Sequence, residues 1–233
     1  MITRTTARIH SVTDLSPTAR EIVFVPETPL TFLAGAFVNI FIPSEDGPKR
    51  RAYSISSDPS DATTFALSIR RVIGGEVSPF FWQPDVIGKT IDIMGPLGMN
   101  TVDKLTRPRV FLVGFGIGVS VIKSLAHHLS TAPHVEELII LTGHRNQTEH
   151  LYKDMFEDLA QNDPRISVRT AFSDPHATDD ATRKGYVHEH LDGLTFDGSD
   201  VYLCGADVPC ELFQKTVAAL GATDVRYSIE SFH

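Results

Sequence analysis

The sequence predicts a two-domain protein, with an antiparallel β-barrel over residues 1–100 and a parallel-sheet α/β domain over residues 101–233. The first reason is length, because 233 residues suit two domains of roughly 100 to 130 residues each. The second is that the first part holds short β-branched runs broken by proline and glycine. The third is that strand and helix patterns alternate in the second part, which is typical of a parallel sheet covered on both faces.

Five apolar or β-branched runs predict the strands of the first domain, and turn residues such as Pro43, Gly47 and Pro59 separate them. Short strands joined by turns favour an antiparallel barrel or a sandwich. The predicted strands are Thr6–Val12, Arg20–Phe24, Phe37–Phe41, Phe65–Arg70 and Thr90–Met94.

The second domain opens on Val110–Val113, a continuous apolar run typical of a strand buried on both faces. Asn146 with Glu149 three residues later predicts a capped helix start, and Asp207 is the predicted cap of a later helix. The domain boundary is expected near Thr101–Pro108. Further strands are predicted at Glu137–Leu141, Ile166–Phe172, Asp200–Cys204 and Val225–Ile229, with apolar helix faces through Val121–Leu129, Leu151–Leu159 and Cys210–Leu220.

Composition excludes several classes of protein. A chain with 42% hydrophobic residues is not disordered, and a net charge of −8 disfavours a nucleic-acid partner. The two cysteines, Cys204 and Cys210, are too few for a four-thiolate iron–sulfur cluster and fit a reduced, cytoplasmic protein. The start lacks the apolar core of a signal peptide. The longest near-apolar run, Val110–Ile122, has 13 residues and is too short to span a membrane.

No metal site is predicted from the histidines. The pairs His127-His128 and His188-x-His190 lack carboxylate or cysteine partners at the spacing of metal ligands. Solvated or capping histidines are the preferred interpretation.

A glycine-rich turn, Gly114-Phe115-Gly116-Ile117-Gly118, joins the first parallel strand to its helix. Ligands of parallel sheets bind at the carboxyl ends of strands, and glycines there let the backbone approach a pyrophosphate. The spacing is G-x-G-x-G rather than G-x-G-x-x-G. On this turn alone, close packing and nucleotide binding are equally good interpretations.

Two motifs of the first domain have residues suited to a flat, phosphorylated ligand. Arg51-Ala52-Tyr53-Ser54 places an arginine for a phosphate and an aromatic ring on the same side of a strand. Leu67–Arg70 leads to a Gly74-Gly75 turn and a short helix start at Ser78, the predicted cap, which together offer a backbone anion site. Taken singly, R-x-Y-S is better explained as a solvated surface strand, and the second motif has a plain hairpin-like turn as its alternative.

Taken in order, the motifs resemble the ferredoxin–NADP⁺ reductase family of flavoproteins. These are R-x-Y-S, the Gly…Ser-Pro turn, G-P-x-G at Gly95–Gly98, the glycine-rich turn, Cys204-Gly205 and Glu230-Ser231-Phe232. The resemblance covers nearly the whole chain, from Thr6 to Phe232. It implies a β-barrel FAD-binding domain, a Rossmann-like NAD(P)-binding domain, and an FAD-dependent NAD(P)H reductase that passes electrons onward.

The resemblance also implies roles for individual residues. Arg51 would bind the FAD pyrophosphate, Tyr53 would lie against the isoalloxazine ring, and Ser54 would contact it near the reactive nitrogen. The nicotinamide would be bordered by Cys204 and Gly205, with Glu230 near the redox centre and Phe232 covering the flavin until nicotinamide displaces it. The remaining implied cofactor-binding residues are Ala52, Ser68, Ile69, Arg70, Gly75, Val77 and Ser78 for FAD, and Gly114 and Gly116 for the nicotinamide dinucleotide.

The nucleotide half departs from the family pattern at several positions. The family turn reads G-G-x-G-I-x-P, whereas Val113 and Val119 stand at its first and last positions, and Ala206 and Pro209 depart after the Cys-Gly. Ser173-Asp174 follows the third parallel strand, where the family approaches the adenosine ribose. A carboxylate suits a ribose diol and repels a 2′-phosphate, so Asp174 favours NADH, while Arg145 opposes this preference.

The predicted function is therefore hydride transfer from NADH or NADPH to FAD, then electron transfer to a separate acceptor. This acceptor is expected to be a ferredoxin-type protein, an oxygenase component or another molecule. The altered nucleotide turn leaves an alternative, a non-catalytic or partner-dependent flavin-binding subunit of a larger complex. A nucleotide-binding protein without flavin is a third interpretation. The basic runs Lys49–Arg51 and Arg70-Arg71 fit phosphate binding and solvation, and a second interpretation is a positive rim that docks an acidic electron-transfer protein.

Overall fold

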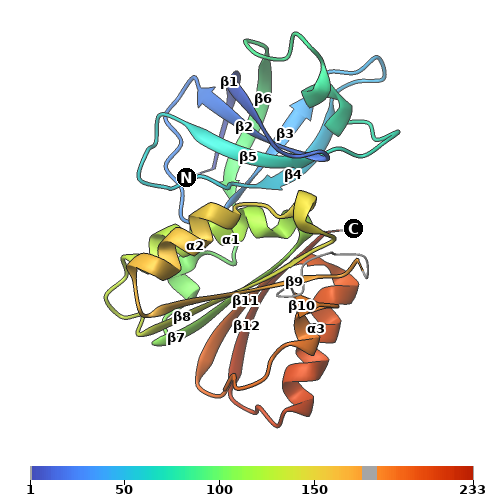
Figure 1. The fold of residues 1–233 in the computed structure, drawn as a ribbon. Helices are drawn as coiled ribbons and strands as arrows, with labels where there is room; N and C mark the ends of the chain where they lie inside the picture. Colours follow the sequence, from blue (N-terminus) through green and yellow to red (C-terminus); the bar gives the residue numbers. More distant parts are fainter. Residues whose placement is uncertain (1, 175–182, 233) are drawn as a thin grey trace. The chain divides into compact units, whose positions relative to one another are not determined.

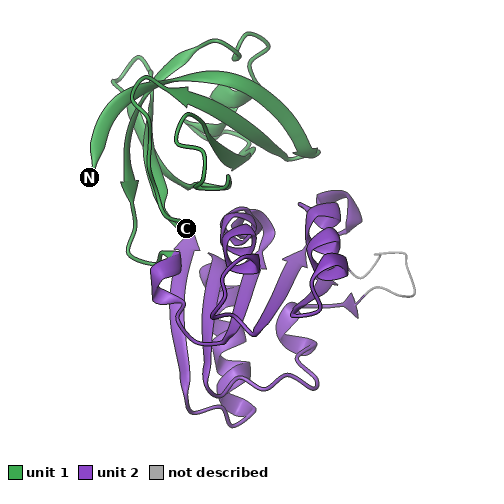
Figure 2. Ribbon diagram, turned by 90° about the vertical axis from the view of Figure 1, so that its left-hand side faces the viewer, with its two compact units in different colours: residues 1–101 green, residues 102–233 purple. Residues whose placement is uncertain are grey.

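The computed structural model describes residues 2–174 and 183–232. The chain forms two compact units, Met1–Thr101 and Val102–His233 (Figure 2). Each unit contains one six-stranded sheet.

The first unit is an antiparallel sheet with the strand order β4-β3-β6-β1-β2-β5 (Figure 1). The predicted antiparallel architecture is confirmed, but the sheet is a half-barrel, because β4 and β5 are edge strands. The bridge between Ile55 and Leu67 brings the end of β4 beside β5. The strands are β1 Thr3–Ser16, β2 Ala19–Pro26, β3 Phe37–Ile42, β4 Lys49–Ser54, β5 Phe65–Arg70 and β6 Thr90–Leu97.

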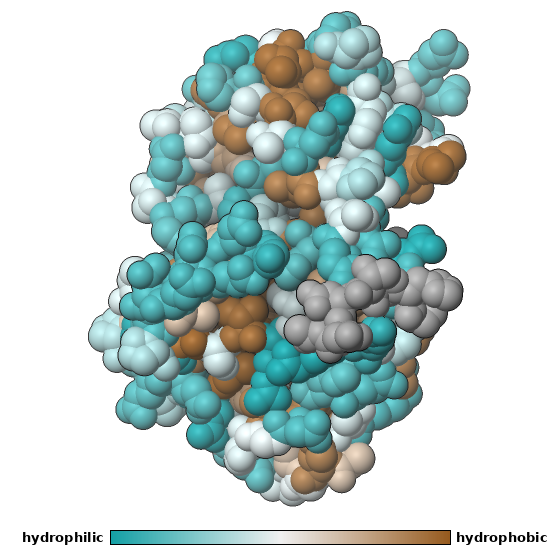
Figure 3. Space-filling model, viewed as in Figure 1, coloured by the Kyte–Doolittle hydropathy of each residue, from teal (hydrophilic) through white to brown (hydrophobic). Residues whose placement is uncertain are grey.

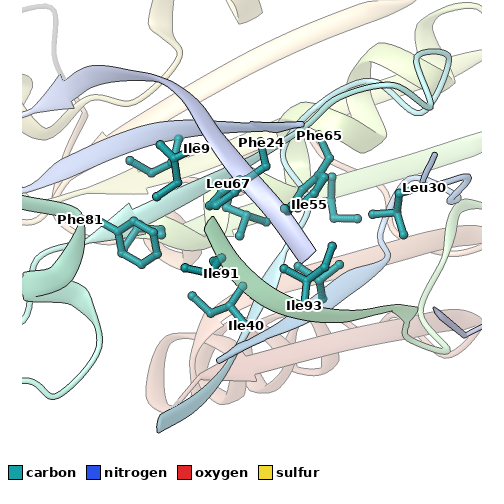
Figure 4. Packing of buried hydrophobic residues seen from close by; sticks show 14 of the residues in the cluster. Ile9, Phe24, Leu30, Ile40, Ile55, Phe65, Leu67, Phe81, Ile91 and Ile93 are labelled. Carbon is teal, nitrogen blue, oxygen red and sulfur yellow. The ribbon is translucent and has the colours of Figure 1, made fainter. Parts of the chain in front are cut away.

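The core of this unit lies inside the curved sheet (Figure 4). Alternate residues of each strand point inward, and fully buried examples are Ile9, Phe24 and Ile40. The rings of Phe24 and Phe65 stack with centroids 5.0 Å apart. Burying a large apolar side chain stabilises the fold by about 1.5–3 kcal/mol, so this core fixes which face of each strand is left for a ligand.

The second unit is a parallel sheet with the order β10-β9-β8-β7-β11-β12. Strands β8, β9 and β10 lie on one side of β7, and strands β11 and β12 lie on the other. The strand order therefore reverses between β7 and β11. Helix α1 (Val119–Ser130) contacts β7, whereas the buried residues of α3 (Asp207–Ala219) pack with the opposite face of the sheet. The strands are β7 Arg109–Phe115, β8 Glu137–His144, β9 Ile166–Phe172, β10 Arg183–Lys184, β11 Ser199–Ala206 and β12 Val225–Phe232.

Two predicted helix starts are wrong in position. Asn146 caps a short 3₁₀ helix, Gln147–Glu149, by accepting a hydrogen bond from the Glu149 amide at 3.2 Å. Helix α2 begins later, at Lys153, after a left-handed residue, Tyr152 with φ of 58°. The predicted cap at Asp207 is also wrong, since Asp207 is the first residue of α3 and Ala206 is its N-cap. Leu220, expected on the apolar face, is exposed at the helix end.

The surface seen in Figure 3 is largely hydrophilic, with separate hydrophobic patches. Among residues 2–174 and 183–232, no helix has the length and apolar content needed to cross a membrane.

Candidate cofactor sites

In the first unit, the edge strand β4 presents two cations and an aromatic ring on one face. Lys49, Arg51 and Tyr53 alternate along the strand, and Tyr53 pairs with Val38 of β3. Paired residues of an antiparallel ladder share a face, and Val38 is fully buried in the core. The three side chains therefore lie on the core-facing side of the sheet, at its open edge.

Tyr53 is positioned by packing against the hydrophobic core. Burial raises the pKa of its phenol to about 12, against the opposing effect of the nearby Arg51 charge. The ring is thus neutral at physiological pH and offers a flat surface. Of its neighbours, Ala52 is exposed and Ser54 is 9% exposed.

The first residues of strand β5 lie beside the end of β4. The Ser56 amide donates to the Ala66 carbonyl at 2.9 Å, which extends the Ile55–Leu67 bridge. Ser68 is buried, and Ile69 is fully buried with its side chain in the core. Any contact of Ile69 with a cofactor would therefore involve its backbone.

The turn after β5 is shaped by two glycines. Gly74 has φ of +73°, a left-handed conformation that glycine adopts without strain. The Gly75 amide donates to the Val72 carbonyl at 3.0 Å, and a Cβ on Gly75 would lie 3.0 Å from the Val72 Cβ. The turn thus favours glycine at both positions, and without side chains there its backbone can be approached closely by a ligand.

Ser78 holds the base of this turn. Its hydroxyl accepts a hydrogen bond from the Val72 amide at 2.8 Å. The prediction that Ser78 caps the following helix is wrong, because the 3₁₀ helix Ser78–Trp82 has Val77 as N-cap and no side-chain cap. The hydroxyl is instead used to close the loop, which sequence spacing alone did not indicate.

Glu76, in this turn, forms ion pairs with Lys49 and Arg51, the two cations on the core-facing side of β4. Its carboxylate lies 3.0 Å from Lys49 Nζ and 3.3 Å from the Arg51 guanidinium. Hydrogen bonding and the charge of Lys49, then the charge of Arg51, hold the pKa of Glu76 below its usual range. Sequence analysis named Lys49 only as part of a basic run, and it missed Glu76. The spacing of Lys49 two residues before Arg51 was the only available signal for the first, and there was none for the second.

These residues fit a cofactor with a flat ring system and a pyrophosphate. Arg51 supplies a planar set of donors suited to phosphate oxygens, and Tyr53 supplies a ring for stacking. Any other residue at position 75 would place a side chain where glycine leaves the backbone uncovered. The ion pairs of Glu76 with Lys49 and Arg51 bring the Gly74–Ser78 turn beside this face of β4.

In the second unit, the glycine turn Gly114–Gly118 lies where the strand order reverses. Ligands of open parallel sheets bind at the carboxyl ends of strands at such a switch point. A Cβ on Gly114 would lie 2.9 Å from Val119 Cα, and one on Gly118 would lie 2.3 Å from the Cys204 carbonyl oxygen. The turn is thus pressed against both α1 and the end of β11.

Gly205 continues this backbone-lined surface from the β11 side. Its φ is +155°, and a Cβ there would lie 2.7 Å from Phe115 Cβ. Gly116 has φ of +56°. Sequence analysis assigned Gly114 and Gly116 to the nucleotide site but gave no role to Gly118. The structure adds Gly118 to this surface, because it closely approaches Cys204. The surface fits a dinucleotide pyrophosphate, which requires backbone without side chains.

Cys204 and Glu230 are brought together on neighbouring strands. They are register partners between β11 and β12. Cys204 is fully buried, and burial first and the Glu230 charge second raise the pKa of its thiol well above 9. The group is therefore a neutral thiol at physiological pH. Phe232, the register partner of Ala206, is 36% exposed at the end of β12.

Ser173 and Asp174 follow β9 and are held against the end of β8. The Ser173 amide donates to the His144 carbonyl at 2.9 Å, and the Asp174 amide donates to the Arg145 carbonyl at 2.8 Å. The structure thus brings Asp174 and Arg145, the two opposing charges of the sequence analysis, to adjacent positions.

His150 contributes an aromatic ring close to this strand end. It lies 4.7 Å from His144 and 5.3 Å from Phe172, measured between ring centroids. Burial, followed by the Lys153 charge, lowers the pKa of His150 to about 4. The imidazole is therefore neutral near pH 7 and adds no positive charge at this strand end.

Both units match models of known domain families. Residues 6–101 match the oxidoreductase FAD-binding domain, and residues 112–214 match the oxidoreductase NAD-binding domain.

Two curated relatives illustrate the likeness. Ferredoxin–NADP reductase B of Sorangium cellulosum (strain So ce56) is 33% identical over 211 residues, covering 86% of this chain and 86% of that protein. The reductase component of phenol 2-monooxygenase from Pseudomonas sp. (strain CF600) is 32% identical over 205 residues, covering 84% of this chain but 56% of that protein. The chain therefore spans little more than half the length of this second relative.

Solved structures share the fold. The cytochrome P450 reductase of Amycolatopsis has a TM-score of 0.87 at 22% identity, covering 99% of this chain and 71% of that one. A ferredoxin NADP⁺ reductase from Neisseria gonorrhoeae, solved with bound FAD and NADP, has a TM-score of 0.82 at 16% identity, covering 98% of each chain.

Proposed function

Because the chain belongs to the ferredoxin–NADP reductase family of FAD- and NAD(P)-binding oxidoreductases, we propose that it passes hydride from NAD(P)H to FAD. The electrons then go to a separate acceptor. When bound, the flavin supplies the chemistry that couples a two-electron donor to one-electron acceptors. The observation that carries the proposal is the occurrence in one chain, in family order, of both matched domains.

The residues of the first unit bind and orient the flavin in this proposal. Arg51 neutralises the pyrophosphate, and the neutral ring of Tyr53 lies against the isoalloxazine. Ser54 contacts the isoalloxazine. The remaining contacts are assigned to Ala52, Ser68, Ile69, Arg70, Gly75, Val77 and Ser78.

The residues of the second unit bind the nicotinamide dinucleotide. Gly114 and Gly116, together with Gly118, hold its pyrophosphate on backbone. Cys204 and Gly205 border the nicotinamide, where the neutral thiol adds no charge to repel a hydride. Glu230 and Phe232 are assigned to the same end of the sheet. In this proposal Glu230 is the polar group, and Phe232 the aromatic ring, nearest the site of hydride transfer.

Anaerobic reduction of the bound flavin tests this function. We expect the purified protein, supplied with FAD, to lose its absorbance in the visible region when NADH or NADPH is added. Dithionite is the control, because it reduces bound flavin without a nucleotide site. Bleaching by dithionite but by neither nucleotide would contradict the proposal.

Turnover with ferricyanide separates the enzyme from the alternative of a partner-dependent flavin subunit. The departures at Val113 and Val119 favour that alternative, since both are fully buried at the glycine turn. Reduction of ferricyanide by the isolated chain supports the enzyme. Turnover that appears only after a partner protein is added supports the subunit.

Asp174 is proposed to favour NADH over NADPH. Replacing Asp174 with arginine should shift the ratio of kcat/KM for NADH over NADPH towards NADPH by about 10- to 100-fold, or about 1.4–2.8 kcal/mol, because the change removes a charge that repels the 2′-phosphate and adds one that attracts it. Steady-state kinetics with both nucleotides measure this ratio. Glu211→Arg, the same charge change on the exposed face of α3, is the control. A wild-type protein that prefers NADPH would refute the assignment.

The acceptor is proposed to be an oxygenase component or a ferredoxin-type protein. The relatives include the electron transfer component of toluate 1,2-dioxygenase and component C of methane monooxygenase. Of the basic residues of this unit, Arg50 and Arg71 are exposed and are not assigned to FAD, and they favour an acidic surface on this partner.

A further inference from the structure

We propose that Glu76 competes with the FAD pyrophosphate for Lys49 and Arg51, so that this carboxylate limits the affinity of the chain for FAD. The inference rests on the proposed function, in which Arg51 receives the pyrophosphate. In this inference, Glu76 lowers the affinity for FAD, although the other residues of its turn favour binding of the cofactor.

The first argument is the geometry of the ion pairs. Glu76 lies 3.0 Å from Lys49 and 3.3 Å from Arg51, so its carboxylate satisfies both cations on the core-facing side of β4. A phosphate that uses the Arg51 donors must replace this carboxylate or share the guanidinium with it. Two anions beside one cation repel each other, which lowers the gain from binding.

The second argument is that Glu76 can move. Its side chain is 51% exposed, and Gly74, two residues before it, has nothing within 4 Å of its Cβ position. Exposed ion pairs are weak, because water screens both charges. The carboxylate is therefore held well enough to compete, but weakly enough to be displaced by a dianionic pyrophosphate.

The third argument is that Glu76 has no other structural duty among the described contacts of the turn. The loop is closed by Ser78, which accepts from the Val72 amide, and by the Gly75 amide, which donates to the Val72 carbonyl. Both contacts are independent of the Glu76 side chain. Removing its charge should therefore leave the turn in place.

The test is the dissociation constant of FAD, measured by quenching of flavin fluorescence in cofactor-free wild type and Glu76→Gln. We expect the variant to bind FAD about three- to tenfold more tightly, the effect of two exposed ion pairs. The advantage should shrink at high salt, where exposed charges are screened. Glu45→Gln, the same charge change at another exposed position of the first unit, should leave the affinity unchanged.

Thermal unfolding of the cofactor-free proteins distinguishes competition from a structural role. Competition predicts that Glu76→Gln binds FAD more tightly even though it loses its ion pairs and is no more stable than wild type. A structural role predicts that stability and affinity both fall. The gain should also disappear in an Arg51→Ala background, because the carboxylate and the phosphate compete for that side chain.

The inference is overturned if wild type binds FAD and Glu76→Gln binds it equally or more weakly. It is also overturned if the gain persists without Arg51. Failure of both wild type and Glu76→Gln to bind FAD would instead refute the proposed function, and the inference with it.

Discussion

Replacing Arg51 with alanine is expected to weaken FAD binding by roughly 100-fold. Arg51 is proposed to donate at least two charge-assisted hydrogen bonds to the pyrophosphate, and such bonds contribute about 1.5–3 kcal/mol each. The side chain is 55% exposed, so solvent screening places the effect at the lower end of this range. The loss of affinity should be larger when Tyr53 is also replaced by alanine, because the isoalloxazine ring then loses the aromatic surface on which it stacks.

Arg50→Ala is the matched control for this prediction. Arg50 is the preceding residue of β4, exposed, and on the opposite face of the strand. The retained FAD is measured by absorbance after ultrafiltration, and the dissociation constant by fluorescence. Circular dichroism verifies that each variant is folded. If Arg51→Ala with Tyr53→Ala keeps FAD as tightly as wild type, the proposed flavin site is wrong.

Replacing Asp200 with alanine should lower the free energy of unfolding of the second unit by about 3–5 kcal/mol. Asp200 is 1% exposed at the start of β11. Its carboxylate accepts from the Thr106 and Arg107 amides at 2.7 and 2.8 Å, and from Arg226 Nε at 2.7 Å. Two backbone amides lose a charged acceptor, and hydrogen bonds to charged groups contribute about 1.5–3 kcal/mol each. Arg226 is 49% exposed and becomes solvated, so the loss of this pair adds little.

Asp224→Ala provides the comparison, because Asp224 pairs with Arg107 at 2.6 Å from a side chain that is 64% exposed. An exposed pair contributes up to about 1 kcal/mol, so this variant should remain close to wild type. Urea unfolding followed by circular dichroism measures both. Equal stabilities for the two variants would show that the Asp200 cluster does not hold residues 106 and 107 against β11.

The strands and the order of the motifs were predictable from sequence because their signals are local. The run Val110–Val113 is apolar at every position, and the structure buries all four residues within β7. Ile166–Phe172 has the predicted bounds in β9. The predicted helix starts at Asn146 and Asp207 were wrong, since a capping residue fits several turn geometries and the downstream backbone decides which one forms.

The contacts that build the sites were decided by tertiary structure. Sequence alone determined that Arg51 and Tyr53 share one face of a strand, because side chains alternate with a period of two. It contained no signal that Glu76, 25 residues after Arg51, would pair with it, because that distance depends on how the β5 turn folds back towards β4. The approach of Gly118 to Cys204 likewise depends on β7 and β11 becoming neighbours. Periodicity is a property of neighbouring residues, whereas strand order and turn geometry result from packing the whole core.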